Sequence, residues 1–568
     1  MEKRFTYFHD WLRFATWAVV CWVVIFWKLG HPALMDPDEA HYAQLTREML
    51  QAGNWTIPLL DGVPYIDKPV LFHWLQGLAI ALLGETETAM RLPSALAAVA
   101  LFWMTQWTGA QLFDDRVGAR AWLMLATMPL TFLLGSIGVF DMVFTAFLFG
   151  AIAFAMVSAL RRRPRLQYVS YVLLSLAVMT KGPVALVLAG VFFLAGLACG
   201  RECRTAILSL RWKTGAVVVV LLSLPWFLWM YYALGWHFVH QYVLAGNLYY
   251  VTQPVSFSNR AVNHTLYGAT FLAGFFPWSI VVLGAAVDAI RRWRAKAKFT
   301  PEEVLLWAWL AVIFIFFSLA RFKVDRYVYP AAPVCCLLAA RAWLSVSVTR
   351  PNLSAARDNV GARWSVALLG VVLIATGIFA GLSVFNLGLE LPQAAMAVPV
   401  SLAVAGFALT FAIFQRRAVS PVLFAAVLVM LLVTYGSVIV IGMPVLERGR
   451  PTAAVAENLR SRLVADDQVA LYRLEKWRFS LRYYLERPLS RLQHPEDVRG
   501  FLSQSSRGYV LMLDEDFTRL RNDGVNLRAI SKRPAITGTT GRGLRKQRWG
   551  SLVVATLDDI PRKPDKPK

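Results

Sequence analysis

Long apolar segments that recur along almost the whole chain constrain its fold more than any other feature. A helix needs roughly 20 mostly apolar residues to cross a bilayer, and about thirteen segments approach that length. Apolar residues make up 57% of the 568 residues and charged residues only 16%. A soluble chain of this length needs more polar surface, and a disordered chain contains fewer apolar residues. The sequence therefore predicts an all-α polytopic membrane protein.

The candidate spans follow one another with mostly short connections. The fifth and sixth are short and are separated by Lys181-Gly182-Pro183, so a bent pair is an alternative to two complete spans. We expect the spans near residues 11–29, 92–112, 118–137, 141–160, 166–180, 183–199, 214–234, 264–290, 303–320, 327–346, 364–385, 395–415 and 420–441.

The positions of lysine and arginine predict how these spans are oriented. Lys and Arg number 58 against 35 Asp and Glu, which gives a net charge of +23. No nucleic-acid recognition motif is present, so we assign the excess to cytoplasmic loops and lipid headgroups rather than to a nucleic-acid partner. With a cytoplasmic N-terminus, all five basic loops fall inside: Arg161 to Arg165, Arg201 to Lys213, Arg291 to Lys298, Arg341 to Arg363, and Gln415 to Arg417.

The same topology places two long loops and the C-terminal region outside. We expect a transmembrane domain over 1–444, with outer loops at 30–91 and 235–263, and a small α/β domain over 445–568. None of the five cysteines lies in that outer domain, so it does not depend on disulfides. Its expected elements are a helix from Pro451 to Leu463 and strands at Val469–Tyr472, Tyr509–Leu513 and Leu552–Ala555.

Acidic and basic residues gather at the outer ends of several separate spans. Charges at a membrane edge are costly unless they are solvated or used, so this clustering indicates a functional site. The simpler interpretation of each residue is a solvated loop charge, a helix cap or a snorkelling lysine, and for His41 and His73 it is packing. The outer charges are Asp36, Asp38, Glu39, Asp67, Lys68, Asp141, Lys181, Arg321, Lys323, Asp325 and Arg326.

Several motifs around these charges resemble a known enzyme family. They are Asp38-Glu39-x-x-Tyr42-Ala43-x-x-x-Arg47-Glu48-Met49, Gly53-Asn54-Trp55-x-x-Pro58, Tyr65-x-Asp67-Lys68-Pro69, Arg91-Leu92-Pro93, Thr180-Lys181-Gly182-Pro183, Pro277-Trp278, Lys323-x-x-x-Tyr327-x-x-Pro330, and the segment from Arg478 to Pro488. Together they resemble the bacterial GT-C glycosyltransferases. Within these they are most similar to family 83, the aminoarabinose transferases that modify lipid A and are related to protein O-mannosyltransferases.

The resemblance implies a GT-C fold and an inverting transfer at the periplasmic face of the inner membrane. The donor would be a sugar on polyprenyl phosphate, such as 4-amino-4-deoxy-L-arabinose, and the acceptor would be lipid A or a related lipid. A carboxylate near the attacking group accepts a proton or stabilises positive charge on the sugar ring. A lysine or arginine stabilises the departing phosphate.

Individual roles follow from the matching motifs. We expect no cofactor and no closed metal site, although a weakly held divalent cation near the outer acids and His264 is an alternative. The expected catalytic residues are Asp38, Asp141 and Glu39; the expected donor-phosphate ligands are Lys68, Tyr327, Lys323 and Arg260; Asp67, Lys181, His264 and Tyr42 are expected to line the site.

Three departures from the family pattern leave the sugar and the acceptor open. Asp67 stands where the family usually has Glu, His41 where many members have Arg, and Lys323-Val324-Asp325-Arg326-Tyr327 replaces Lys-Leu-Pro-x-Tyr. A transferase acting on protein or cell-wall glycan is therefore an alternative. A transporter and a non-catalytic scaffold are further alternatives, but we find no internal repeat, and the charges lie at one face rather than at the membrane midplane.

Overall fold

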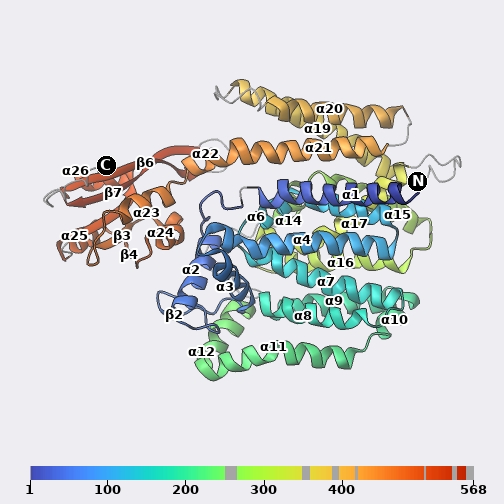
Figure 1. Cartoon of the computed structure of the whole chain (residues 1–568), viewed down its shortest axis with the longest axis horizontal. Helices are drawn as coiled ribbons and strands as arrows, with labels where there is room; N and C mark the ends of the chain where they lie inside the picture. Colours follow the sequence, from blue (N-terminus) through green and yellow to red (C-terminus); the bar gives the residue numbers. More distant parts are fainter. Residues whose placement is uncertain are drawn as a thin grey trace.

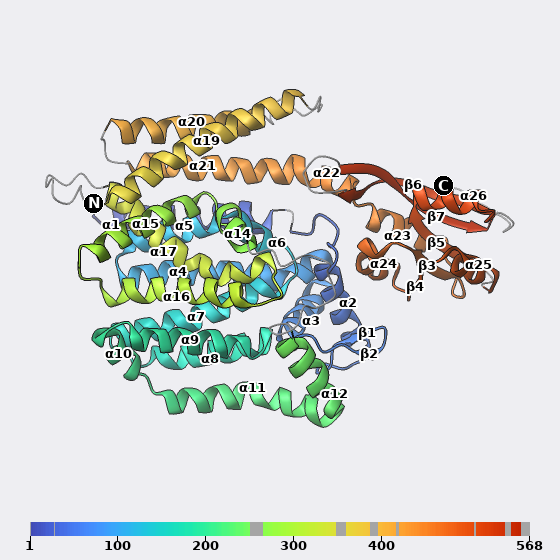
Figure 2. The same ribbon diagram turned by 180° about the vertical axis from the view of Figure 1, so that it is seen from behind.

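Long helices lying side by side form most of the molecule, and a small domain containing a sheet projects from one end (Figure 1). The computed structural model describes residues 2–27, 29–249, 265–347, 359–386, 396–415, 420–504, 507–539 and 547–557. The N-terminus lies at the opposite end from the small domain, and both views agree on this arrangement (Figures 1 and 2).

Every candidate span falls on helical structure. Within the described ranges, eight helices are long and apolar enough to cross a membrane: α4 (Glu87–Leu112), α7 (Phe140–Leu160), α11 (Trp212–Leu234), α16 (Pro301–Leu319), η3 (Asp325–Ala331) with α17 (Ala332–Ser347), α19 (Val360–Asn386), α20 (Ala397–Phe414), and α21 (Pro421–Ser437) continuing through η5 (Val438–Gly442) into α22 (Met443–Arg448). The all-helical polytopic membrane fold is thus confirmed.

The remaining candidates are bent or short. Two bent pairs bring the number of spans up to ten: α5 (Asp115–Ala126) with α6 (Pro129–Ser136), bent by 67°, and α14 (Leu266–Gly274) with α15 (Trp278–Arg294), bent by 111°. Proline contributes to both breaks, since Pro129 starts α6 and Pro277 precedes α15, and proline has no N–H to continue a helix. Shorter apolar helices account for the other three: α1 (Glu2–Cys21) with η1 (Trp22–Phe26), α8 (Leu166–Lys181), and α9 (Val184–Ala198).

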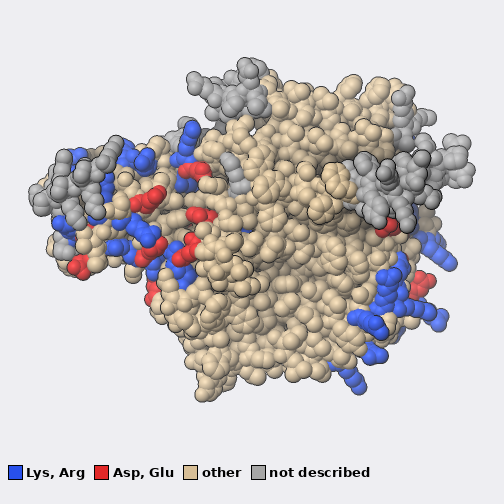
Figure 3. Space-filling view, viewed as in Figure 1, with Lys and Arg blue, Asp and Glu red and all other residues tan. Residues whose placement is uncertain are grey.

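Charge separates the two ends of the helical slab. The viewed face is almost free of charged residues between its ends (Figure 3). Lys and Arg dominate the end that carries α10 (Arg201–Leu208), whereas acidic and basic residues mix at the end with the small domain (Figures 1 and 3). An apolar belt between two polar ends is the arrangement that a bilayer requires, and the basic end matches the predicted inner side.

The first outer loop covers the mixed-charge end of the slab. It contains α2 (Asp38–Gln51), a short hairpin of β1 (Leu59–Leu60) and β2 (Val63–Pro64), and α3 (Leu71–Leu83). Ten residues of α2 are buried, so this helix packs inside the protein rather than lying exposed on it. The helix α12 (Trp236–Phe238) and the π-helix η2 (Val239–Tyr249) lie at the same end (Figure 2).

The C-terminal region forms a mixed five-stranded sheet with the strand order β4-β3-β5-β7-β6. The strands are β3 (Gln468–Tyr472), β4 (Ser490–Leu492), β5 (Gly508–Leu513), β6 (Leu527–Thr539) and β7 (Gln547–Leu557). Its helices are α23 (Thr452–Arg460), η6 (Glu475–Trp477), α24 (Arg478–Leu485), α25 (Pro495–Gln504) and α26 (Asp514–Asn522). Two apolar clusters cover its two faces, and the predicted strands correspond to β3, β5 and β7. The predicted domain boundary at 444/445 falls within α22.

The small domain docks onto the first loop through α24. Asp36 Oδ1 accepts hydrogen bonds from the backbone N–H groups of Phe479 and Ser480, at 3.0 and 2.9 Å, and so caps the start of that helix. Arg482, on the same helix, pairs with Glu48 at 3.1 Å and with Asp61 at 2.9 Å. A polar capping contact and two ion pairs therefore fix α24 against the membrane domain.

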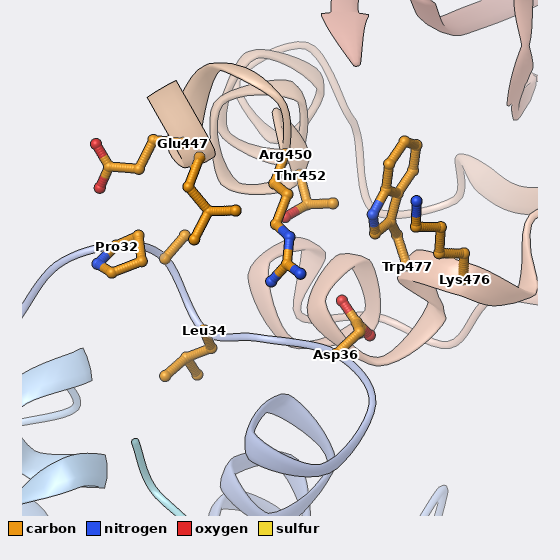
Figure 4. A pocket seen from close by; sticks show the side chains of 10 residues that line it. Pro32, Leu34, Asp36, Glu447, Arg450, Thr452, Lys476 and Trp477 are labelled. Carbon is orange, nitrogen blue, oxygen red and sulfur yellow. The ribbon is translucent and has the colours of Figure 1, made fainter. Parts of the chain in front are cut away.

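A small cavity of about 50 Å³ lies at this junction (Figure 4). Asp36, Arg450 and Trp477 line it from three separate segments. Because its volume accommodates only a few water molecules, we treat it as a feature of the docking interface rather than as a substrate site.

The capping carboxylate makes docking sensitive to pH. Burial raises the pKa of Asp36 from 3.8 to about 6, and the hydrogen bonds from α24 and the charge of Arg450 offset only part of that effect. Because the folded protein then binds the proton more tightly than the unfolded chain, stability should rise as the pH falls from above 6 toward 4.

We predict that Asp36→Asn removes this dependence, since the amide oxygen still accepts both hydrogen bonds but does not titrate. Thermal unfolding of both proteins in one detergent should show the wild type gaining a few °C, about 1–2 kcal/mol, relative to the variant between pH 7.5 and 4.5. A difference in melting temperature that is the same at every pH would contradict this.

Candidate active site

The start of α2 brings Asp38 and Tyr42 to one side of the helix. They are four residues apart, so their side chains lie one turn apart on the same face. Tyr42 is buried, and its ring centroid lies 4.9 Å from that of Phe140 at the start of α7. Asp38 therefore points toward the N-terminal end of α7, where Asp141 is located.

Four charged residues from four separate elements form a continuous chain of ion pairs. Lys181 Nζ, at the end of α8, lies 2.7 Å from Asp141 Oδ1. Arg326 Nε, in η3, lies 2.7 Å from Asp141 Oδ2, and a terminal nitrogen of the same guanidinium pairs with Asp38 Oδ2. Bases and acids alternate in the order Lys181, Asp141, Arg326, Asp38. Asp141 therefore lies between two bases, and Arg326 lies between two acids. We call these four residues the ion-pair chain.

The ion-pair chain is buried at one end and open at the other. The side chain of Asp141 is 3% exposed and that of Lys181 7%, whereas Arg326 is 22% and Asp38 35% exposed. Burying Asp141 alone would be very costly, and its two cationic partners offset that cost. A ligand that approaches from solvent therefore meets Asp38 and Arg326 first.

Lys68 and aromatic rings border the open end. Lys68 Nζ pairs with Asp67 Oδ1 at 2.8 Å and lies 5.9 Å from the centroid of the Phe140 ring. Lys181 Nζ lies 5.5 Å from the same ring and 4.3 Å from the ring of Tyr327. Lys68 and Lys181 thus border the same Phe140 ring, which Tyr42 also contacts, while Asp67 pairs with Lys68 and Tyr327 lies against Lys181.

Glu39, next to Asp38, is held in a different and closed arrangement. Its Oε1 accepts hydrogen bonds from Arg91 Nε at 2.6 Å and from the backbone N–H of Gly138 at 2.8 Å. Its Oε2 accepts from Arg91 at 3.0 Å and from the backbone N–H of Met35 at 2.8 Å. All four contacts are protein groups outside the ion-pair chain.

This arrangement joins the starts of α2 and α7. Gly138 lies three residues before Asp141, and Glu39 directly follows Asp38. A side chain at position 138 would collide with the Met90 carbonyl, because a Cβ there would lie only 2.7 Å from that oxygen. We therefore interpret Glu39 as a residue that fixes Asp38 relative to Asp141, rather than as one that touches substrate.

The other expected site residues are placed elsewhere or not described. Lys323 Nζ donates hydrogen bonds to the Phe317, Ser318 and Ala320 carbonyls, and so caps the C-terminus of α16. Arg260 and His264 lie outside the described residues.

Arg326 is central to this arrangement, although the resemblance does not predict it as a site residue. The sequence marks it only as an outer charge within a departure from the family motif. The signal that could have identified it was the replacement of Lys-Leu-Pro-x-Tyr by a segment with an additional basic residue.

His41 packs within the protein, as its simpler interpretation suggested. Its ring lies edge-on to Tyr65 and Phe479, with centroid distances of 4.7 and 4.4 Å. Burial lowers the pKa of His41 to about 4, so the imidazole is neutral at neutral pH. Across the described ranges, no group of three or more His, Cys, Asp or Glu side chains is arranged to hold a metal ion. Metal independence itself stays a prediction.

Comparisons with known sequences identify relatives. The family model described as dolichyl-phosphate-mannose-protein mannosyltransferase matches residues 67–229, which include Lys68, Asp141 and Lys181. An undecaprenyl phosphate-alpha-4-amino-4-deoxy-L-arabinose arabinosyl transferase from Pectobacterium carotovorum is 32% identical over 331 residues, which cover 55% of each chain. A protein of the same description from Sodalis glossinidius is 29% identical over 406 residues, 68% of each chain. The chain thus spans between about half and two thirds of the length of these curated relatives.

Comparison of structures extends the similarity to nearly the whole chain. ArnT from Cupriavidus metallidurans bound to undecaprenyl phosphate superposes with a TM-score of 0.70 at 20% identity, covering 97% of this chain and 99% of that one. The apo form of the same protein gives a TM-score of 0.68 over 96% of this chain. The GT-C fold, and the sequence resemblance to the aminoarabinose transferases, are therefore confirmed.

The Glu39–Arg91 contact yields a prediction about stability. Glu39→Gln or Arg91→Met should each lower the free energy of unfolding by about 3–5 kcal/mol, because each leaves a buried charge without its partner. The double variant should lose less free energy of unfolding than the two single variants together, since it removes both buried charges. Thermal unfolding of the purified variants tests this, and additive losses would contradict it.

Proposed function

Because this chain shares sequence and fold with the polyprenyl-phosphate aminoarabinose transferases, we propose that it is an inverting glycosyltransferase. It transfers a sugar from polyprenyl phosphate to lipid A or a related lipid. The observation that carries the proposal is the convergence of Asp38, Asp141, Lys68 and Arg326 at the outer end of the helices. Carboxylates next to partly exposed cations match the two charges that develop in such a transfer.

The reaction forms one bond and breaks another at the anomeric carbon of the sugar. The acceptor oxygen attacks from the face opposite the phosphate, and the bond between the anomeric carbon and the phosphate oxygen breaks. When the acceptor is a hydroxyl, its proton passes to Asp38, which is the most exposed carboxylate of the ion-pair chain. When the acceptor is itself a phosphate, no proton moves, and the carboxylates stabilise the positive charge on the ring.

The departing lipid phosphate carries away the electron pair of the broken bond. Lys68, with 17% of its side chain exposed, is placed to neutralise that charge. Tyr327, whose ring lies against Lys181, is placed to donate a hydrogen bond to the same phosphate. Lys68 Nζ and Lys181 Nζ lie 5.9 and 5.5 Å from the centroid of the same ring, that of Phe140; Lys181 stays with Asp141, and Lys68 contributes its charge to the phosphate.

We further propose that the protein resides in the bacterial inner membrane with its site facing the periplasm. The site lies beside α2, at the end with the small domain (Figure 1), opposite the end where Lys and Arg dominate (Figure 3). Cytoplasmic loops carry the excess of Lys and Arg, so the site end faces outward. A polyprenyl phosphate with its chain beside the apolar helices would present its phosphate at this level.

A second candidate acceptor is a protein or a cell-wall glycan. The match of residues 67–229 to the protein mannosyltransferase model favours this alternative. Proteoliposomes given a labelled polyprenyl phosphate-linked aminoarabinose, with lipid A, membrane protein and glycan together, distinguish the acceptors. Our proposal requires the label in lipid A, whereas label only in protein or glycan favours the alternative.

Asp38→Asn should lower transfer by at least about 100-fold, because the amide can neither accept the proton nor carry negative charge. Turnover of labelled donor in the same proteoliposomes measures the loss. Asp61→Asn is the matched control: Asp61 lies in the same loop with 48% of its side chain exposed, and its partner Arg482 keeps its pair with Glu48, so turnover should stay near normal. Near-normal turnover of the Asp38 variant would show that the catalytic assignment is wrong.

Lys68→Ala should weaken donor binding and slow turnover together, by about 10- to 100-fold in kcat/KM, because the phosphate loses a charged hydrogen-bond donor. Steady-state kinetics against donor concentration test this. The control is Lys213→Ala, an exposed lysine of the basic end. An unchanged kcat/KM in the Lys68 variant would remove that lysine from the donor site.

A further inference from the structure

We propose that Arg326 is an exchangeable partner that pairs with Asp38 in the absence of donor and transfers to the donor phosphate when donor binds. This inference rests on the proposed function, and it makes Asp38 available to the acceptor only after donor is in place. It assigns a donor-dependent role to a residue outside the expected set of site residues.

The first argument is the balance of charge. The ion-pair chain contains two acids and two bases, and the neighbouring Asp67–Lys68 pair is also neutral. Both cations of the ion-pair chain are therefore matched by carboxylates. A phosphate that enters this site brings an uncompensated negative charge into partly buried surroundings, which is costly unless a cation is reassigned to it. One carboxylate must then give up a cationic partner.

The second argument identifies which cation of the ion-pair chain joins Lys68 at the phosphate. Lys181 is only 7% exposed, and its Nζ lies within 5.5 Å of the centroids of the Phe140, Phe144 and Tyr327 rings. Arg326 lies nearer the open end, and its guanidinium has several N–H groups arranged in a fork. It can keep Nε on Asp141 while its terminal nitrogen turns from Asp38 to a phosphate oxygen.

The third argument concerns Asp38 itself. In the structure, Asp38 Oδ2 accepts from Arg326, so in this arrangement that oxygen is already engaged by the guanidinium. Transfer of the guanidinium to phosphate frees this oxygen for the proton of the acceptor. The exchange thus orders the reaction, with donor before acceptor. After transfer the departing phosphate carries additional negative charge, and Arg326 returns to Asp38 when the lipid phosphate leaves.

The exchange predicts an unusual effect on binding. If Asp38 and phosphate compete for one guanidinium, removing the charge of Asp38 must tighten phosphate binding, and it must do so only while Arg326 is present. Undecaprenyl phosphate is the probe, because it binds without reacting. Native mass spectrometry of the full chain in nanodiscs measures its dissociation constant for the wild type, Asp38→Asn, Arg326→Gln and the double variant.

We expect Asp38→Asn to tighten binding by about 3- to 30-fold and Arg326→Gln to weaken it by about tenfold. In the Arg326→Gln background, Asp38→Asn should have no further effect. Arg321→Gln is the matched control: this exposed arginine lies in the same loop, and its loss removes the same charge without altering the dissociation constant. Arg326→Lys keeps the positive charge and should restore part of the affinity for undecaprenyl phosphate. It also replaces Arg326→Gln in the comparison if that variant does not fold.

The outcomes separate this inference from the proposed function. If the wild type binds undecaprenyl phosphate but Asp38→Asn does not tighten that binding, the proposed exchange of Arg326 is wrong. The transferase proposal is then unaffected. The same conclusion follows if the tightening persists without Arg326, because Arg326 is then only a structural counter-ion. If the wild type does not bind undecaprenyl phosphate at all, the proposed function fails together with the exchange.

Discussion

The organisation of the site depends on one buried carboxylate held between two cations. Asp141 lies in the first turn of a membrane-spanning helix with 3% of its side chain exposed, where an unpaired negative charge would be prohibitively costly. Lys181 from α8 and Arg326 from η3 stabilise it from two sides. Because the partners come from different helices, the same interaction fixes the relative positions of these helices and assembles the charged site.

A second buried contact positions the more exposed carboxylate against this centre. Glu39 bonds to Arg91 of α4 and to the backbone just before α7, so the first turn of α2 is fixed to both helices. The small domain provides a third contact that holds this region, because Asp36, two residues before Asp38, caps α24. Changes in domain docking therefore reach the candidate site through only two residues of chain.

Much of the fold was predictable because a bilayer imposes strong rules on sequence. Span length and apolar composition located every helical span, and the loop charges identified the two ends. The number of spans was less predictable, because α8 and α9 are shorter than a usual span and because proline bends two others. The strands β4 and β6 were missed, since neither contains the short buried run that marks the central strands.

The candidate site was predictable only in part. The convergence of Asp38, Asp141, Lys68 and Lys181 followed from their shared position at the outer ends of helices. The roles of Arg326, Lys323 and Glu39 depend on partners that sequence does not reveal. Arg326 reaches two acids located 185 and 288 residues earlier. Lys323 instead caps its own helix, and Glu39 finds Arg91 in α4.

The most direct test of the account is mass spectrometry of lipid A from a transferase-null strain that expresses this chain, beside the Asp38→Asn variant. Our account predicts a mass gain of one sugar with the intact chain and none with the variant, when both are present in the membrane in equal amounts. An unmodified lipid A in a strain that supplies the donor would contradict lipid A as the acceptor. An equal gain with Asp38→Asn would contradict the site.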